Sequence, residues 1–129
     1  PFESLFIPTS NTNTSTLTEL PFAHRLIATE FNLNHSLSAL TAAAKINCAN
    51  YQCLLAELGL SENSDGMMSP HNLLMTREAL WVIPRSQESY QGFYVNALGF
   101  AGTLLAKSDL QLQQLDEIGY IKLLKAVAL

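Results

Sequence analysis

The chain has 129 residues, of which 48% are hydrophobic and 14% are charged, and its formal net charge at pH 7 is −4. This length and hydrophobicity suit one compact domain with its own core and exclude an intrinsically disordered chain. The acidic balance argues against a general binder of nucleic acids or anionic membranes, and no apolar run of about eighteen residues predicts a membrane span.

The first half of the chain predicts one strand and one long helix. Residues 8–20 are rich in Thr, Ser and Asn, which favours a loop or linker. Residues 22–31 alternate polar and apolar side chains, as a strand does. Over residues 36–58, apolar residues recur in steps of three and four, which predicts a helix. Asn34 or Ser36 can cap its start, and the glycine that follows suits its end.

Residues 72–76 and 79–83 predict a β-hairpin with Arg77 at its tip. Both strands are apolar on both faces, so the pair is expected within a covered sheet rather than a solvated one. Pro84 lacks an N–H donor and is expected to end the second strand. Arg77 and Arg85 are therefore expected to mark the two solvated ends of the hairpin.

The last third of the chain combines an irregular apolar segment with helix. Residues 93–107 are apolar and are interrupted by two glycines, whereas residues 108–128 predict a helix that Ser108 caps and Gly119 interrupts. The order of strand, helix, two strands, mixed segment and helix predicts one α+β domain over residues 1–129, with an antiparallel sheet and flanking helices.

The cysteines and the first residue indicate the setting of the chain. Cys48 and Cys53 form no C-x-x-C motif and point apart on a helix, so we expect reduced thiols in a cytoplasmic protein. No secretory signal peptide is visible. Because the chain begins with Pro1 instead of Met, we expect it to be the C-terminal part of a longer protein.

The histidines form no catalytic or metal-binding motif. His24, His35 and His71 are scattered, with neither H-x-H nor H-x-x-x-H spacing, and are predicted to be surface or strand residues. Ser69 lies in no G-x-S-x-G motif. No metal site is predicted.

The segment "NALGFAG", residues 96–102, is a candidate anion site. Its glycines can let the backbone approach a ligand or can allow tight packing, and packing is the more common reason. It lacks the Walker pattern. Asn96 supplies an amide, and Thr103 and Lys107 are four apart, which places them on one side of a helix or a strand. The Lys107 ammonium suits a phosphate.

Two blocks, "NLLMTREALWVIPRSQE" and "NALGFAGTLLAK", together with the following "LQQLDEIGYIKLLKAV", resemble the C-terminal region of ATP adenylyltransferases, also called diadenosine tetraphosphate (Ap4A) phosphorylases. The resemblance is close over residues 71–128 and looser at "LPFAHRL". It implies a fold of the HIT-like, galactose-1-phosphate-uridylyltransferase-like superfamily. The catalytic histidine of this family lies in an H-x-H-x-Q motif that this chain lacks, so no catalytic residue is expected here and the chain alone is expected to be inactive.

The resemblance implies a nucleotidyl transfer in two steps. In the intact enzyme the histidine attacks the α-phosphate of a dinucleoside polyphosphate such as Ap4A, ATP leaves, and phosphate then releases ADP from the adenylyl-histidine. The nucleotide and phosphate contacts of the family correspond here to Asn96, Ala97, Leu98, Thr103 and Lys107.

Arg77 and Arg85 are weaker candidates for ligand contacts. The expected partners are dinucleoside polyphosphates, ATP, ADP, phosphate and an N-terminal part with H-x-H-x-Q, but neither a nucleic acid nor a membrane. A divalent cation such as Mg²⁺ can accompany the polyphosphate, although no ligand cluster in the sequence demands one. The alternatives are a non-catalytic nucleotide-binding module and a structural accessory domain; an upstream H-x-H-x-Q would favour the enzyme.

Overall fold

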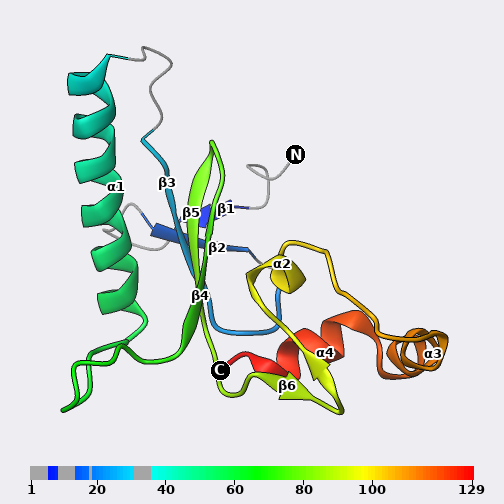
Figure 1. Cartoon of the computed structure of the whole chain (residues 1–129). Coiled ribbons are helices and arrows are strands. Elements are labelled where there is room, and N and C mark those ends of the chain that lie inside the picture. The colour runs from blue at the N-terminus through cyan, green and yellow to red at the C-terminus, as the bar shows by residue number, and fades with distance from the viewer. Residues whose placement is uncertain (1–5, 9–13, 18, 31–35) are drawn as a thin grey trace.

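The computed structural model describes residues 6–8, 14–17, 19–30 and 36–129 (Figure 1). Its elements in chain order are β1 (Phe6–Pro8), β2 (Thr14–Leu17), β3 (Arg25–Ala28), α1 (Leu37–Glu57), β4 (His71–Met75), β5 (Ala79–Pro84), β6 (Ser89–Tyr90), β7 (Phe93–Tyr94), α2 (Ala97–Phe100), α3 (Asp109–Ile118) and α4 (Tyr120–Val127).

The main sheet is antiparallel, with the strand order β1-β2-β3-β5-β4, and β6 and β7 form a separate antiparallel pair. This arrangement confirms the predicted α+β class. The predicted strand over residues 22–31 is present as the shorter β3. The predicted loop or linker over residues 8–20 is wrong for residues 14–17, which form β2. The Ser and Thr residues of this segment are typical of loops, so its composition did not predict a strand. It forms one because β1 and β3 pair with it on either side.

Helices cover both faces of the interior strand β5. On one face, Leu80 and Val82 pack with Leu54 and Leu55 of α1. On the other face, Trp81 and Ile83 belong to the larger core, which includes residues of β7, α2 and α4 (Figure 1). Every residue of β5 is buried, so its apolar character on both faces follows from its position inside the sheet, between β3 and β4.

The expectation of a covered sheet fails for β4, because this strand is an edge of the described sheet. Leu73 and Met75 of β4 are 41% and 57% exposed. Both lie on the α1 face, paired with Val82 and Leu80, but α1 packs mainly against β3 and β5. Pattern alone cannot distinguish an edge strand from a central one when both are apolar.

Helix α1 has the predicted caps. The Ser36 Oγ accepts a hydrogen bond from the Ala39 N–H at 3.3 Å, whereas the alternative cap Asn34 lies outside the described residues. At the other end Gly59 adopts a φ of 69°, and the N–H of Leu60 donates to the Leu55 carbonyl at 2.9 Å. This glycine-dependent turn ends the helix and directs the chain toward β4.

Only the last turns of α1 reach the core. Leu54 and Leu55 are buried, whereas Leu37 is 81% exposed at the other end of the helix. The apolar periodicity therefore predicted the helix correctly but overstated its buried length.

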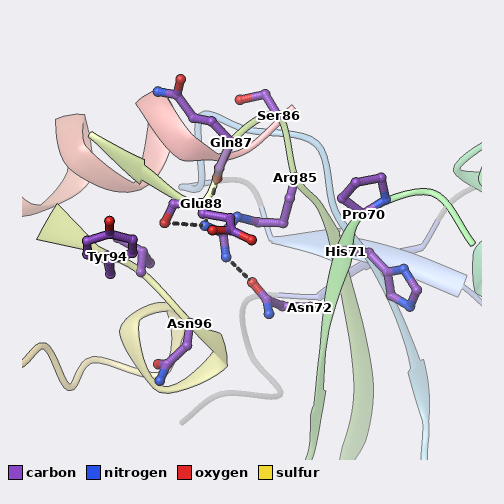
Figure 2. Close-up of a pocket in the computed structure, with 10 residues that line it drawn as sticks. Pro70, His71, Asn72, Arg85, Ser86, Gln87, Glu88, Tyr94 and Asn96 are labelled. Atoms are coloured by element: carbon purple, nitrogen blue, oxygen red, sulfur yellow. Dashed lines mark hydrogen bonds between the residues drawn. The ribbon is translucent and has the colours of Figure 1, made fainter. Parts of the chain in front are cut away.

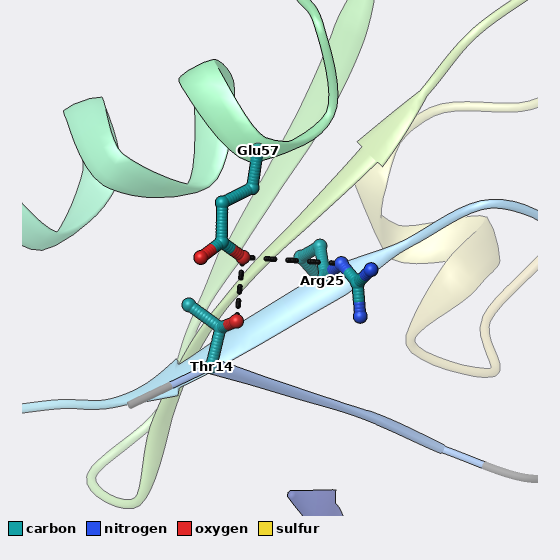
Figure 3. A network of polar contacts seen from close by, with 3 residues as sticks. All are labelled: Thr14, Arg25 and Glu57. Atoms are coloured by element: carbon teal, nitrogen blue, oxygen red, sulfur yellow. Dashed lines mark hydrogen bonds and ion pairs between the residues drawn. The ribbon is translucent and has the colours of Figure 1, made fainter. Parts of the chain in front are cut away.

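A polar contact fixes the last turn of α1 against the sheet (Figure 3). The Glu57 Oε2 accepts a hydrogen bond from the Thr14 Oγ1 at 2.5 Å and lies 3.9 Å from the Arg25 Nε. The side chains of Glu57 and Arg25 are partly exposed, so this ion pair contributes modestly to stability. It connects α1 with β2 and β3.

Candidate functional site

A cavity opens at the end of the β4–β5 hairpin opposite its tip. It measures about 550 Å³ and is lined by residues 70–72, 85–88 and 94–96. Figure 2 shows Arg85 between Asn72 and Glu88, with Tyr94 and Asn96 across the opening. We call this the hairpin cavity. Residues that are far apart in the sequence meet here because β4 begins where β5 ends and β7 follows shortly afterwards.

Arg85 holds the wall of the hairpin cavity together. Its Nε donates to the Val127 carbonyl at 3.2 Å, its Nη2 donates to the Gln87 carbonyl at 2.8 Å, and its Nη1 donates to the Asn72 Oδ1. The Arg85 guanidinium also lies 5.3 Å from the centre of the Phe100 ring. A planar guanidinium presents five N–H donors in a fixed fork and can serve acceptors in several directions at once, whereas the three donors of a lysine radiate from a single nitrogen.

These bonds dock the end of α4 onto the residues that follow β5. The last carbonyls of a helix have no partner within the helix. Here the Val127 carbonyl also accepts from the Ser86 N–H at 2.9 Å, and the Ala126 carbonyl accepts from the Gln87 side chain at 3.0 Å. Arg85 therefore has a structural role, and the expectation that it marks a solvated end is wrong.

The charge of Arg85 is partly buried. Burial lowers the pKa of its guanidinium below the usual value, and the nearby Glu88 charge opposes that shift. With its N–H groups directed to carbonyls and to Asn72, Arg85 has little capacity left for a phosphate.

The histidine beside this cavity is also engaged. The His71 Nε2 and the Tyr51 hydroxyl lie at 2.5 Å, and its Nδ1 lies 2.7 Å from the Ser69 carbonyl. Figure 2 shows its ring turned away from Arg85 and Asn72. His71 is the strand residue that the sequence predicted, and its contacts give it no role as a base in the cavity.

His24 differs from its prediction as a surface or strand residue. It is buried just before β3, where its Nε2 accepts from the Leu17 N–H at 2.8 Å. His35 lies outside the described residues.

A second cavity lies on the other side of Tyr94 and Asn96. It measures about 380 Å³ and is lined by residues 92–94 and 103–105 and by Asn96, Leu98, Lys107 and Gln111. We call this the loop cavity. Tyr94 and Asn96 line both cavities, so the two spaces adjoin.

Lys107 lies in the loop cavity because two contacts hold its segment. Its N–H donates to the Gln111 Oε1 at 2.7 Å, and its Nζ lies 5.6 Å from the centre of the Tyr94 ring. Residues 103–106 are neither helix nor strand, so the regular spacing argument for Thr103 and Lys107 does not apply. Both nevertheless line the same cavity, because an irregular segment connects α2 to α3 around it.

Asn96 caps the short helix α2. Its Oδ1 accepts from the Gly99 N–H at 3.3 Å, and its side chain is exposed between the two cavities. Leu98 lines the loop cavity, whereas the neighbouring Ala97 lines neither cavity.

The glycines of the segment have structural explanations. A Cβ on the buried Gly99 would lie 2.7 Å from the Val95 Cγ1, so close packing requires this glycine. Gly102 adopts a φ of 104°, which allows the turn after α2. The packing explanation that the sequence favoured therefore accounts for Gly99, whereas Gly102 is explained by its backbone conformation.

Arg77 lies outside this region. It is exposed at the tip of the hairpin, whereas the residues that line the two cavities belong to the opposite end of the hairpin and to the segments that follow it. Five residues of β4 at about 3.4 Å each separate the two ends by roughly 17 Å. Arg77 therefore cannot contact a ligand confined to the two cavities.

Sequence reasoning missed several residues of the two cavities. Asn72, Glu88, Tyr94 and Gln111 all line one or both. Asn72 pairs with Ile83 near the end of β5, so a register assignment from the hairpin tip would have placed it close to the residues that follow β5, among them Glu88. Nothing local marks Tyr94 or Gln111, because their positions depend on how β7 and α3 pack.

The described residues contain no group of three or more His, Cys, Asp or Glu side chains that could hold a metal ion. Cys48 and Cys53 are exposed and unpaired. No helix in the described part of the chain combines the length and apolar character that a membrane crossing requires.

Solved structures with the same fold include those of yeast Ap4A phosphorylase Apa2. The structure of its complex with Ap4A aligns with a TM-score of 0.61 and 23% identity, covering 95% of this chain and 40% of that chain. The structure without a named ligand gives a TM-score of 0.61 and 22% identity, covering 95% and 42%. The complex with AMP gives 0.55 and 23%, covering 92% and 40%.

This chain thus spans about two fifths of the length of the solved proteins that it matches. No curated protein sequence matches it. A family model, that of the ATP adenylyltransferase C-terminal domain, matches residues 18–129. This match covers most of the chain, including both cavities, β3 and every helix. The chain belongs to the ATP adenylyltransferase C-terminal domain family.

Proposed function

We propose that this chain is the nucleotide-binding C-terminal part of an ATP adenylyltransferase that acts as an Ap4A phosphorylase. One observation carries the proposal: Asn96, Leu98, Thr103 and Lys107, which were selected by sequence resemblance, line one cavity. The family match and the fold shared with yeast Ap4A phosphorylase support it.

The proposed reaction proceeds in two displacements at phosphorus. A histidine nitrogen outside this chain attacks the α-phosphorus of Ap4A, the bond to the bridging oxygen breaks, and ATP leaves. An oxygen of inorganic phosphate then attacks the adenylyl-histidine, the P–N bond breaks, and ADP leaves with the histidine regenerated. The sequence of this chain contains no H-x-H-x-Q motif, and the role proposed for its own residues is to bind and orient the nucleotide.

The residues of the loop cavity are suited to a polyphosphate. The Lys107 ammonium offers a positive charge, and the Thr103 hydroxyl and the Asn96 amide can donate hydrogen bonds. Positioned donors lower the barrier of phosphoryl transfer by stabilising charge on the phosphate oxygens and by aligning the reacting groups. A divalent cation would supply further charge neutralisation when bound.

The test is Lys107→Ala in the intact protein that contains this chain. Losing one charge-assisted hydrogen bond of about 1.5–3 kcal/mol lowers kcat/KM by roughly ten- to a hundredfold. ADP release from Ap4A and phosphate measures this loss. Lys107→Arg keeps the charge with a different shape, so it should retain partial activity.

Lys122→Ala is the matched control, because it removes the same charge from an exposed position on α4. We expect kcat/KM to stay within about twofold, as for an ordinary surface substitution. Equal losses from both variants would indicate a diffuse electrostatic effect. An intact protein that releases no ADP from Ap4A would contradict the proposed function itself.

A further inference from the structure

Tyr94 is an exposed aromatic residue at the boundary between the two cavities. It is 67% exposed, whereas its neighbours Phe93 and Val95 are only 1% and 5% exposed. This alternation follows from the extended backbone, which turns Phe93 and Val95 to the core and Tyr94 outward. Exposed tyrosines are common, but this ring forms part of the lining of both cavities.

A positive charge lies on the loop-cavity side of the Tyr94 ring. The Lys107 Nζ is 5.6 Å from the ring centre, and Lys107 lines the loop cavity but not the hairpin cavity. Gln111 holds this arrangement: it accepts from the Lys107 N–H at 2.7 Å, and its Nε2 donates to the Gly92 carbonyl at 3.5 Å. Gly92 is two residues before Tyr94, so Gln111 connects the lysine to the hairpin that carries the ring.

The hairpin cavity has a different character. Its cation, Arg85, is engaged by carbonyls and by Asn72, and the Glu88 carboxylate is close enough to affect the Arg85 pKa. A phosphate would gain little there. The remaining polar groups include the Asn96 amide and backbone carbonyls, which can hydrogen-bond the edge of a nucleobase.

We propose that a nucleobase stacks on the Tyr94 ring from the hairpin cavity while its phosphates pass Asn96 to reach Lys107 in the loop cavity. This assignment rests on the proposed function, because it assumes that the chain binds a nucleotide. It divides the two cavities between the base and the phosphates. The base and the lysine occupy different sides of the same ring, so the cation–π contact remains when the base binds.

The experiment compares ATP with inorganic tripolyphosphate, which carries the same number of phosphates without a nucleoside. Isothermal titration calorimetry of the 129-residue chain with each ligand gives the ratio of the two dissociation constants. Stacking of a base on an aromatic ring corresponds to about five- to a hundredfold in affinity. We expect the wild-type chain to prefer ATP by about that factor.

The variants separate the base from the phosphates. Tyr94→Leu removes the stacking surface, so the preference for ATP should fall close to one, whereas Tyr94→Phe keeps the ring and should keep the preference. Lys107→Ala should weaken both ligands by a similar factor and leave their ratio unchanged. Tyr94 lies outside the core, so Tyr94→Leu should retain the wild-type circular dichroism spectrum.

Two outcomes would overturn the assignment. If Tyr94→Leu binds ATP and tripolyphosphate with the wild-type dissociation constants, the ring does not contact the base. If Tyr94→Leu weakens both ligands equally, its role is to hold Lys107, and the base lies elsewhere. Failure of the wild-type chain to bind ATP at all would overturn the nucleotide-binding role, and the stacking assignment with it.

Discussion

At the scale of single residues, His24 shows how a buried hydrogen bond fixes the tautomer of a histidine. Its Nε2 accepts from the Leu17 N–H, so the proton must be on Nδ1, which donates to the Phe22 carbonyl at 2.8 Å. Burial lowers the pKa of the His24 ring, the Phe22 carbonyl opposes this shift, and the Arg25 charge adds to it.

The lowered pKa predicts loss of stability in acid. The unfolded pKa is near 6.5 and the folded one is lower, so the contribution of neutral His24 is complete above pH 6.5 and is lost as the pH falls through the folded pKa. Urea unfolding should therefore give a lower free energy at about pH 5 than at about pH 7.5. If the free energy of unfolding of His24→Gln falls by the same amount between these two pH values, the pH dependence belongs to other groups.

The hydrogen bonds of Arg85 lead to a second prediction about the stability of the fold. Arg85→Ala leaves the Gln87 and Val127 carbonyls without their charged donor, which should lower the free energy of unfolding by about 1.5–3 kcal/mol. Thermal or urea unfolding measures this change. Arg85→Lys should not restore the wild-type value, since an ammonium cannot reach Val127, Gln87 and Asn72 together. If Arg85→Ala has the wild-type free energy of unfolding, Arg85 has no structural role.

At the scale of elements, Gly99 of α2 allows the close packing that holds this helix, and its cap Asn96, beside the two cavities. Gly99→Ala places a methyl group against the buried Val95 side chain and should cost about 1–3 kcal/mol of stability. Because Asn96 caps the same helix, the shift should also weaken ATP binding. Val95→Ala combined with Gly99→Ala relieves the contact, so the two changes together should cost less than the sum of the separate changes. Additive costs would mean that Gly99 is not required by Val95.

The elements differ in how directly their sequences predict them. Helix α1 and the β4–β5 hairpin have strong local patterns and are found close to their predicted bounds. β2 has a loop-like composition and forms because β1 and β3 flank it. Propensity for strand depends on neighbours, so the composition of a segment alone is a weak guide to β structure.

At the scale of the whole molecule, the chain has a sheet with helices on both faces and two adjoining cavities, the hairpin cavity and the loop cavity. Its sequence contains no H-x-H-x-Q motif. We therefore predict that the 129-residue chain alone does not turn over Ap4A. Incubation with Ap4A and phosphate should release no ADP above the uncatalysed background. Release at an ordinary enzymatic rate of about 1 s⁻¹ or more would place the nucleophile within this chain.

By itself, the sequence determined the longer helices, the β4–β5 hairpin and the family. Apolar periodicity, the Ser36 and Ser108 caps and the Gly119 break are set by neighbouring residues, so they predicted α1, α3 and α4. The residue blocks around Arg85 and Lys107 indicated the family, and the family model confirms it.

Only the tertiary structure decided which of these side chains form the cavities and which are used for packing. Arg85 is structural because Val127, 42 residues further along the chain, brings its carbonyl to the guanidinium. Tyr94 becomes part of both cavities because Gln111 holds the Lys107 segment against the hairpin of β7. Burial and hydrogen bonding at these positions depend on contacts between distant segments, and a local pattern of residue types does not contain that information.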